Sequence, residues 1–282
     1  MSRANGGNEY VESLARGLGI IEAFDADHPE MTLSEVARRT GLSPASARRG
    51  LHTLAALGYV RQVGKRFLLS ARILALGSTY LRAAHVDEAM LPELRRIVGR
   101  FGDAASVSIL DGMDILYIAH LSEQRATRLT AGIGVTYPAY ATSMGRVLLA
   151  DLSADELDAY FAVAKLEKLT EFTEIDLGRL RTILRDVRQG GFATAVDQLD
   201  YGITALAVPI TGPGGEVVAA LNSSGFSGRV TIDAMVEQRL GELRTSAARI
   251  ARVLDRHRPL LHSIMRAVDR APSRPAPYIV TG

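Results

Sequence analysis

The chain of 282 residues contains no cysteine. Disulfides, thiolate metal sites and a cysteine nucleophile are therefore excluded, and the absence fits a reducing compartment. Long hydrophobic runs are missing too, because charged residues interrupt every apolar stretch well short of the roughly 20 residues that cross a bilayer. Residues 1–10 are polar and lack the apolar core of a secretion signal. We expect a cytoplasmic protein that has no membrane partner.

The usual signatures of catalysis are also missing. The sequence has neither the G-x-S-x-G turn of a hydrolase nor the phosphate-binding pattern G-x-x-x-x-G-K-[ST]. Residues 132–134 read Gly-Ile-Gly but lack the third glycine of a dinucleotide-binding loop. The six histidines include no pair at i, i+4 and no carboxylate arranged for zinc. We therefore expect no cofactor, no metal site and no enzymatic activity.

Negative charge is absent from one segment. No Asp or Glu occurs between Val36 and Val86, although nine Lys and Arg residues lie there. Residues 1–85 carry eleven Lys and Arg against seven Asp and Glu, whereas the rest of the chain carries twenty-two against twenty-four. The positive charge is therefore local, and a polyanion such as DNA is its natural partner. Since single domains cluster around ~100 to 150 residues, a chain of this length is expected to hold two.

An amphipathic helix is predicted over residues 11–24, and two shorter helices follow it. Thr32 and Glu35 form a capping box, and Gly41 suits the left-handed position at a helix end. Ser43 suits the N-cap of the next helix, which has proline at its first position. The apolar positions of that helix leave a small, polar and cationic face outward, which suits the major groove of DNA. On this face we expect DNA contacts from Ser43, Pro44, Ala45, Ser46, Arg48, Arg49 and His52.

Two strand-like runs follow, residues 59–63 and 66–69, on either side of Gly64. A tight turn between such runs predicts a hairpin with basic residues at its tip, which is the wing of a winged helix-turn-helix. We expect Arg61, Lys65 and Arg66 to contact sugar and phosphate. The alternative is a small α+β module whose charged face is only solvated. The helix caps, the missing acids and the order of the elements together favour DNA binding.

Several motifs in this order resemble the isocitrate-lyase-regulator (IclR) family of transcription factors. Leu-Ser-Glu-Val-Ala at 33–37 and Thr-Gly-Leu-Ser at 40–43 look like its helix-turn-helix, and the resemblance covers about residues 10–260. Residues 47–49 and 74–81 look most like the subgroup that regulates aromatic-acid breakdown by the β-ketoadipate route. Motifs that resemble the family's effector domain lie at residues 137–150, 190–193, 207–210 and 219–225.

The rest of the sequence predicts strands and helices without regular β-α-β alternation, which favours an antiparallel sheet covered by helices and an α+β fold. The resemblance implies that this part is a GAF-like effector-binding domain. Strands are expected at residues 105–110, 115–121, 192–196, 205–210 and 217–222, and a long final helix at about 232–258. The expected divisions are a winged helix-turn-helix DNA-binding domain at 10–70, a linker helix at 71–86, the effector-binding domain at 87–260 and a disordered tail at 261–282.

The helix predicted to begin at Thr142-Ser143 is a candidate site for a small molecule. The first turn of a helix leaves N–H groups unpaired and positively polarised, so a carboxylate can dock there without a lysine. Alternatively, Thr142 or Ser143 only caps its own helix. The family resemblance favours a pocket, and carried over position by position it implies effector contacts from Ser143, Met144, Asp197, Ala205, Asn222 and Ser224. Candidate aromatic walls are Tyr117, Tyr137 and Tyr140.

Two positions of this pocket depart from the family pattern. Gln198 follows Asp197 where relatives commonly have adjacent acids, and Asn222 replaces a small hydroxyl residue. Both changes alter the polar groups that a ligand would meet.

These features together predict a ligand-responsive transcription regulator. Its expected partners are a double-stranded DNA operator with an inverted repeat, a small carboxylic-acid effector such as an aromatic acid or a metabolite of the β-ketoadipate pathway, and further copies of the chain in a homodimer or homotetramer. One alternative is a cytosolic enzyme acting on a small acid, with an attached nucleic-acid-binding module. Another is an architectural DNA-binding protein without a ligand. Whether the regulator represses or activates depends on where its operator lies, which the protein sequence does not encode.

Overall fold

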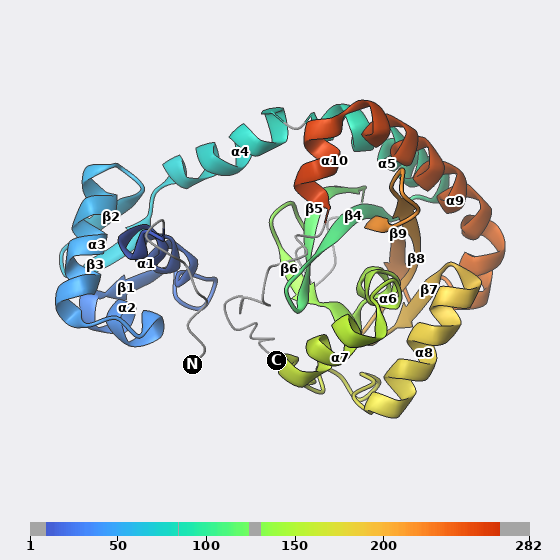
Figure 1. The fold of residues 1–282 in the computed structure, drawn as a ribbon, viewed down its shortest axis with the longest axis horizontal. Coiled ribbons are helices and arrows are strands. Elements are labelled where there is room, and N and C mark those ends of the chain that lie inside the picture. The colour runs from blue at the N-terminus through green and yellow to red at the C-terminus, as the bar shows by residue number, and fades with distance from the viewer. Residues whose placement is uncertain (1–9, 84, 124–130, 266–282) are drawn as a thin grey trace. The chain divides into compact units, whose positions relative to one another are not determined.

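The structure, a computed structural model, describes residues 10–83, 85–123 and 131–265 (Figure 1). The chain divides into two compact units, and the boundary falls after Thr79, inside a helix. None of the helices in these ranges is both long and apolar enough to cross a membrane.

The first unit is a winged helix-turn-helix, as predicted. A three-stranded antiparallel sheet in the order β1-β3-β2 packs with three helices. Its small core includes Ile20, Met31, Val36, Leu51 and Phe67. The elements are α1 (Glu12–Glu22), β1 (Glu30–Thr32), α2 (Leu33–Thr40), α3 (Pro44–Ala56), β2 (Val60–Val63), β3 (Arg66–Leu69), a single 3-10 turn η1 (Ala71–Ile73) and α4 (Leu74–Ala83).

The helix boundaries in this unit follow the local signals in the sequence. The Thr32 backbone N–H donates to Glu35 Oε2 at 2.7 Å, and Thr32 Oγ1 accepts from the Glu35 N–H at 3.4 Å, which confirms the capping box. Gly41 ends α2 at φ 68°, in the left-handed region that glycine tolerates best. The strand β1 was not predicted. It is three residues long and forms because Met31 pairs with Phe67 of the wing.

The second unit contains a six-stranded antiparallel sheet in the order β6-β5-β4-β9-β8-β7. The combination of this unit with the first confirms the predicted α+β class. Its elements are α5 (Val86–Phe101), β4 (Ala104–Asp111), β5 (Asp114–Ser122), β6 (Thr136–Pro138), η2 (Ala139–Ala141), α6 (Ser143–Ala150), α7 (Ala154–Val163), α8 (Leu177–Gly190), β7 (Ala193–Val196), β8 (Ile203–Thr211), β9 (Val217–Phe226), α9 (Ile232–Arg256) and α10 (Arg258–Ile264).

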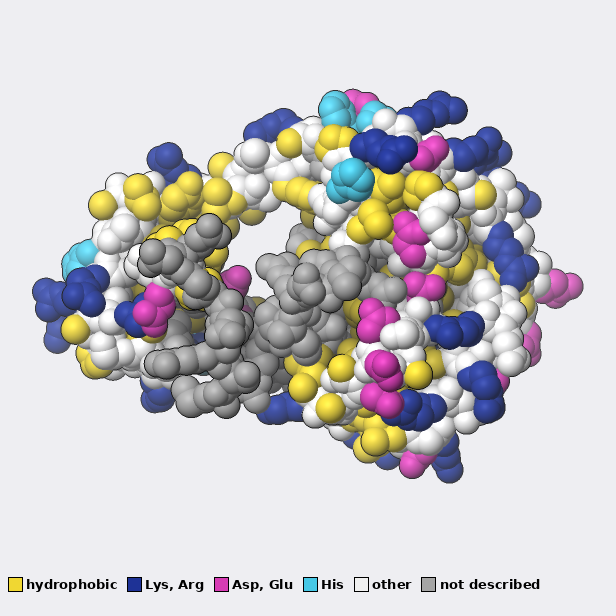
Figure 2. Space-filling view, in the orientation of Figure 1, with side chains coloured by type: hydrophobic (Ala, Val, Ile, Leu, Met, Phe, Trp, Pro, Cys, Tyr) yellow, Lys and Arg dark blue, Asp and Glu magenta, His cyan; other side chains and the backbone are white. Residues whose placement is uncertain are grey.

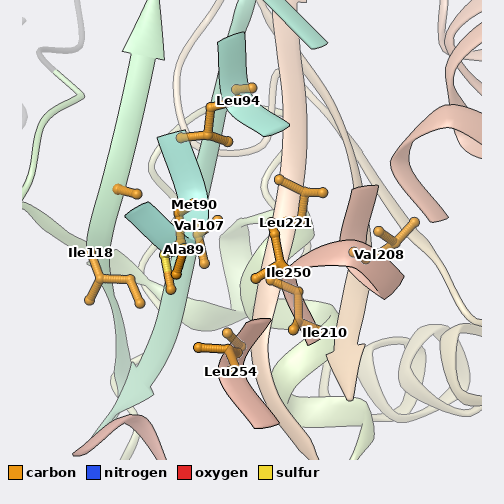
Figure 3. Close-up of a cluster of buried hydrophobic side chains, with 14 of the residues drawn as sticks. Ala89, Met90, Leu94, Val107, Ile118, Val208, Ile210, Leu221, Ile250 and Leu254 are labelled. Atoms are coloured by element: carbon orange, nitrogen blue, oxygen red, sulfur yellow. The ribbon is translucent and has the colours of Figure 1, made fainter. Parts of the chain in front are cut away.

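Helices cover both faces of this sheet. On one face α5, α9 and α10 pack in a close apolar core, in which Met90, Val107, Leu221 and Ile250 meet (Figure 3). On the other face lie α6, α7 and α8 (Figure 1). Successive strand residues alternate between the faces, so that Leu221 lies in the first core while its neighbour Asn222 points to the face under α6.

The disordered tail was predicted to begin at residue 261, which is too early because α10 extends to Ile264. Leu261 and Ile264 lie in α10 and are buried in the core of the second unit. The long final helix ends at Arg256, and a separate short helix with Pro259 in its first turn follows, which returns apolar side chains to the sheet. Residues 266–282, the remainder of that prediction, lie outside the described residues.

Candidate DNA-binding surface and effector cavity

The outward face of α3 is basic. Arg48 and Arg49 are exposed, whereas Ala47 and Leu51 are fully buried in the core of the unit. Figure 2 shows Lys and Arg side chains gathered over this helix. Neither arginine has an ion-pair partner within the described ranges. Of the other predicted contacts on α3, Pro44, Ala45 and His52 are exposed, Ser46 is half-buried, and the Ser43 hydroxyl caps the helix by accepting from the Ser46 N–H at 3.3 Å.

The three cations of the wing, which is the hairpin of β2 and β3, differ in whether an acidic side chain pairs with them. Lys65 lies at the β2–β3 turn beside Gly64, and Lys65 and Arg61 are exposed. Arg66 begins β3 and turns toward β1, where its Nε lies 3.4 Å from Glu30 Oε1. The charge of Arg66 is therefore partly neutralised, and Lys65 and Arg61 are the cations best placed to meet a phosphate.

Arg39 is not part of this surface, although it lies in the same acid-poor segment. Its Nη2 lies 2.5 Å from Asp25 Oδ2, and its Nε donates to the Ala23 carbonyl at 3.0 Å. The side chain therefore anchors the loop after α1. Not every arginine of the acid-poor segment therefore contributes to the exposed basic surface.

A cavity of about 550 Å³ lies between α6 and the sheet. Its floor consists of small side chains on three neighbouring strands, where Ala104, Ser224 and Ala205 stand side by side in the strand register. The volume is of the size that holds small ligands. The open space exists because alanine, serine and glycine occupy positions that larger side chains would fill.

A β-bulge shapes the wall formed by β5. The pairing of β4 with β5 shifts between Val107 and Ser108, so that Tyr117 and His120, three residues apart, both line the cavity. His120 Nδ1 lies 2.9 Å from Ser106 Oγ, and burial lowers the pKa of His120, which favours the neutral ring. Strict alternation from Tyr117 would have placed His120 on the opposite face, which is why the sequence did not identify it as a cavity residue.

At the start of α6, one residue caps the helix and the next two line the cavity. Thr142 Oγ1 accepts from the Gly145 N–H at 2.9 Å, so Thr142 is the cap. Ser143 and Met144 are the first helical residues, whose N–H groups have no acceptor within the helix, and both line the cavity. The helix is capped, and its positive end lies at the cavity wall.

Five of the six predicted effector residues line the cavity. They are Ser143, Met144, Ala205, Asn222 and Ser224. Asp197 is not among the lining residues. Its backbone is in the left-handed region at φ 52°, and its carboxylate accepts from the Gly202 N–H at 2.7 Å and from Ser227 Oγ at 3.1 Å. Asp197 therefore holds two loops together.

Two of the three predicted aromatic walls are present. Tyr117 and Tyr137 line the cavity with their ring centroids 5.6 Å apart in an edge-to-face arrangement. The Tyr140 hydroxyl instead donates to the Glu167 carbonyl at 2.7 Å and is not part of the lining. Asn222 is 4% exposed, and its Oδ1 has no hydrogen-bond partner in the described part of the chain.

Charged groups gather at one margin of the cavity. Asp103 and Arg229 both line it, and they form an ion pair at 2.9 Å. The buried Arg239 holds the other carboxylate oxygen of Asp103 at 2.6 Å. This approach needs Gly225, because a Cβ there would lie 2.8 Å from Asp103 Oδ2. Within residues 10–265 as described, no three His, Asp or Glu side chains come together as metal ligands would.

Comparison with known proteins decides the family. A profile described as "Bacterial transcriptional regulator IclR C-terminal" matches residues 78–252, and "IclR helix-turn-helix domain" matches residues 13–64. The chain belongs to the IclR family. An IclR regulator acts by binding DNA, so the exposed face of α3 belongs to its DNA-binding domain and the cavity to its effector domain. The enzyme alternative finds no support, because the relatives are transcriptional regulators.

Among IclR relatives, the Pca regulon regulatory protein of Pseudomonas putida is 37% identical over 245 residues, which cover 86% of this chain and 84% of that protein. The p-hydroxybenzoate hydroxylase transcriptional activator of Acinetobacter baylyi is 32% identical over 85% of this chain and 90% of its own length. A crystal structure of an IclR homolog complexed with 4-hydroxybenzoate, from Microbacterium hydrocarbonoxydans, is 26% identical, has a TM-score of 0.70, and covers 86% of this chain and 98% of that one.

Proposed function

We propose that this IclR regulator senses a small carboxylic acid, with single-ring aromatic acids as the first candidates. The observation that carries the proposal is the placement of Ser143 and Met144, the first turn of α6, on the wall of the cavity. Unpaired N–H groups at a helix start bind a carboxylate well, and the helix dipole adds to the attraction. The aromatic walls Tyr117 and Tyr137 would pack against a ring.

The relatives support an aromatic acid. One structural neighbour holds 4-hydroxybenzoate, and two of the relatives carry names from the p-hydroxybenzoate and Pca systems. A cavity of about 550 Å³ has room for one substituted benzene ring with its polar groups. The same chemistry would also admit a short aliphatic acid such as a β-ketoadipate-pathway metabolite.

On the DNA side, we propose that α3 reads one half of an inverted repeat and that two or four copies of the chain assemble on it. Support for assembly comes from α1, where Leu14 and Leu18 lie one turn apart and are 63% and 48% exposed. Such an apolar stripe on a basic DNA-binding unit suits contact with a second copy. A regulator of this kind works where the chromosome lies, so we place it in the cytoplasm.

A thermal-shift screen tests the effector. The probes are benzoate, 4-hydroxybenzoate, 3,4-dihydroxybenzoate, adipate and 4-hydroxybenzamide as an uncharged control. A ligand present at 100 times its Kd adds about 2.7 kcal/mol to the stability of the native state, so a binding acid raises the melting temperature by several degrees. If every acid leaves the melting temperature unchanged, the proposed effector class is wrong.

A further inference from the structure

The second unit buries two arginines in different ways. Arg239 is 5% exposed and is paired with Asp103 at 2.6 Å. Arg146 is 4% exposed and has no ion-pair partner among the described residues. Within the described part of the chain its guanidinium donates to neutral groups, namely the carbonyls of Tyr140 and Thr194 at 3.1 Å each and the side-chain Oε1 of Gln198 at 2.5 Å.

Arg146 nevertheless remains charged. Burial lowers the pKa of Arg146 to about 10, which is still well above neutral pH. The acid whose charge favours the protonated form is Glu174, but its carboxylate pairs with Arg179, at 3.7 Å, and forms no ion pair with Arg146. A buried charge without a counter-ion is costly, because the protein interior cannot replace the solvation that water gave.

This charge lies directly behind the cavity wall. Gln198 lines the cavity and at the same time accepts the hydrogen bond from Arg146 Nη2. Arg146 follows Ser143 by three residues, so the guanidinium belongs to the same helix whose first turn lines the cavity. In a medium of low dielectric constant, a charge in this position attracts an anion in the cavity over a longer distance than it would in water.

We infer that Arg146 is a fixed positive charge behind the wall of the effector cavity and that the neutral Gln198 leaves it without an ion pair, so that the cavity selects an anion over an uncharged molecule of the same shape. The inference deepens the proposed function and rests on it, because it concerns the same cavity. Glutamate at position 198 would place a counter-ion on Arg146, and the charge would no longer act on the ligand. Gln198 is therefore a specificity-determining residue, and Arg146 acts through the wall without touching the ligand.

Gln198 also has a local role, which the test must separate from this one. Its Nε2 donates to the Phe172 carbonyl at 2.5 Å, and its Oε1 accepts from the Glu174 N–H at 3.0 Å. These bonds hold the loop before α8. A substitution at Gln198 can therefore disturb the cavity without any change of charge, and an affinity for one ligand would not distinguish the two causes.

The test compares an acid with its amide. 4-Hydroxybenzoate and 4-hydroxybenzamide have nearly the same shape but differ by one charge, so the ratio of their Kd values cancels general damage to the cavity. Calorimetric titration of the wild type should show tighter binding of the acid. Gln198→Glu should reduce the acid-to-amide preference about tenfold, as expected for a unit charge roughly 10 Å away at an effective dielectric constant of about 20. Gln198→Met removes every hydrogen bond of this side chain, a larger loss than in Gln198→Glu, without adding charge, and it should keep the preference within about twofold.

Two further measurements complete the test. Because buried charges are screened little by salt, the loss in Gln198→Glu should persist at 0.5 M NaCl. Arg146→Gln should reduce the preference like Gln198→Glu, provided that circular dichroism shows a folded protein. If the acid binds the wild type but Gln198→Glu and Gln198→Met change both ligands equally, Gln198 only holds the loop and the inference is overturned. If the acid does not bind the wild type, the proposed function fails, and the inference fails with it.

Discussion

At the scale of single residues, one carboxyl group on the β4–β5 hairpin is expected to destabilise the folded protein. Asp114 is half-buried and pairs across the hairpin with Asp111. Desolvation, with the like charge of Asp111, raises the pKa of Asp114 from 3.8 to about 6. The folded state therefore binds this proton more tightly than the unfolded chain does, and stability is lost as the pH rises between about 4 and 6.

We expect Asp114→Asn to raise the free energy of unfolding by about 1 kcal/mol at pH 8 and to change it little at pH 3.5, where the aspartate is mostly protonated in both states. At about 1.4 kcal/mol per pKa unit, the shift from 3.8 to about 6 would correspond to about 3 kcal/mol, and the expected gain is set lower because solvent reaches part of the side chain and screens its charge. Urea denaturation at the two pH values measures the difference. An equal gain at both would show that packing, and not titration, is the cause.

Asn222 offers a second test, in which stability and affinity move in opposite directions. Its Oδ1 is buried without a partner in the described part of the protein, so Asn222→Leu removes an unsatisfied polar group and should leave the unliganded protein as stable or more stable. If the amide contacts the effector, the same change should weaken 4-hydroxybenzoate binding by about 1 to 3 kcal/mol. Thermal melts and calorimetric titration check the two halves. A destabilised variant with normal affinity would assign Asn222 to the fold.

The residues that sequence alone identified are those whose role depends on near neighbours in the chain. Thr32 and Glu35, three positions apart, were predicted to form a capping box, and the structure confirms it. The residues that it missed depend on distant partners. Arg146 meets Gln198 from 52 residues away, a separation at which no periodicity or spacing reports a contact.

At the scale of elements, strands of four or more residues were predictable and the three-residue strands were not. The strands β4, β5, β8 and β9 have eight to ten residues each, enough to show their pattern, and all appear where expected. The strands β1 and β6 have three residues each and exist only because a neighbouring strand supplies their hydrogen bonds. The bulge in the β4–β5 pair also leaves no signal in the sequence, yet it decides which residues of β5 face the cavity.

The helix α3 and the wing are expected to contribute differently to DNA binding. Arg49→Ala should cost about 1 to 3 kcal/mol on operator DNA and far less on random DNA, because a base-reading contact is lost. Lys65→Ala and Arg66→Ala together should weaken both duplexes alike, since the wing is expected to contact phosphate and sugar. Most of that loss should come from Lys65, because Arg66 already pairs with Glu30.

Fluorescence anisotropy with a labelled operator and a scrambled duplex measures these affinities, and the single variants Lys65→Ala and Arg66→Ala serve as matched controls. Equal losses on both duplexes for Arg49→Ala would reassign that residue to a phosphate contact. A loss confined to the operator for the wing variant would mean that the wing reads bases.

At the scale of the whole molecule, the two units have separate cores. The apolar cluster that holds the helix-turn-helix together shares no residue with the two clusters of the second unit. Substitutions in the cavity should therefore leave the fold of the DNA-binding unit intact, and a change in DNA affinity on ligand binding must come from coupling between units, which ligands exert through differential affinity for two states.

The net charge of +2 gives no hint of how strongly the molecule should depend on salt when it binds DNA, because the positive charge is local. Each chain presents Arg48, Arg49, Arg61 and Lys65 exposed and without ion pairs within the described ranges. Two copies on an inverted repeat would then neutralise about six phosphates, and the logarithm of the affinity should fall with the logarithm of the salt concentration at a slope near −5. Operator titrations between 50 and 300 mM KCl measure the slope. Lys65→Ala should make it shallower by about one or two, and an affinity that does not change with salt would rule out phosphate contacts as the source of binding.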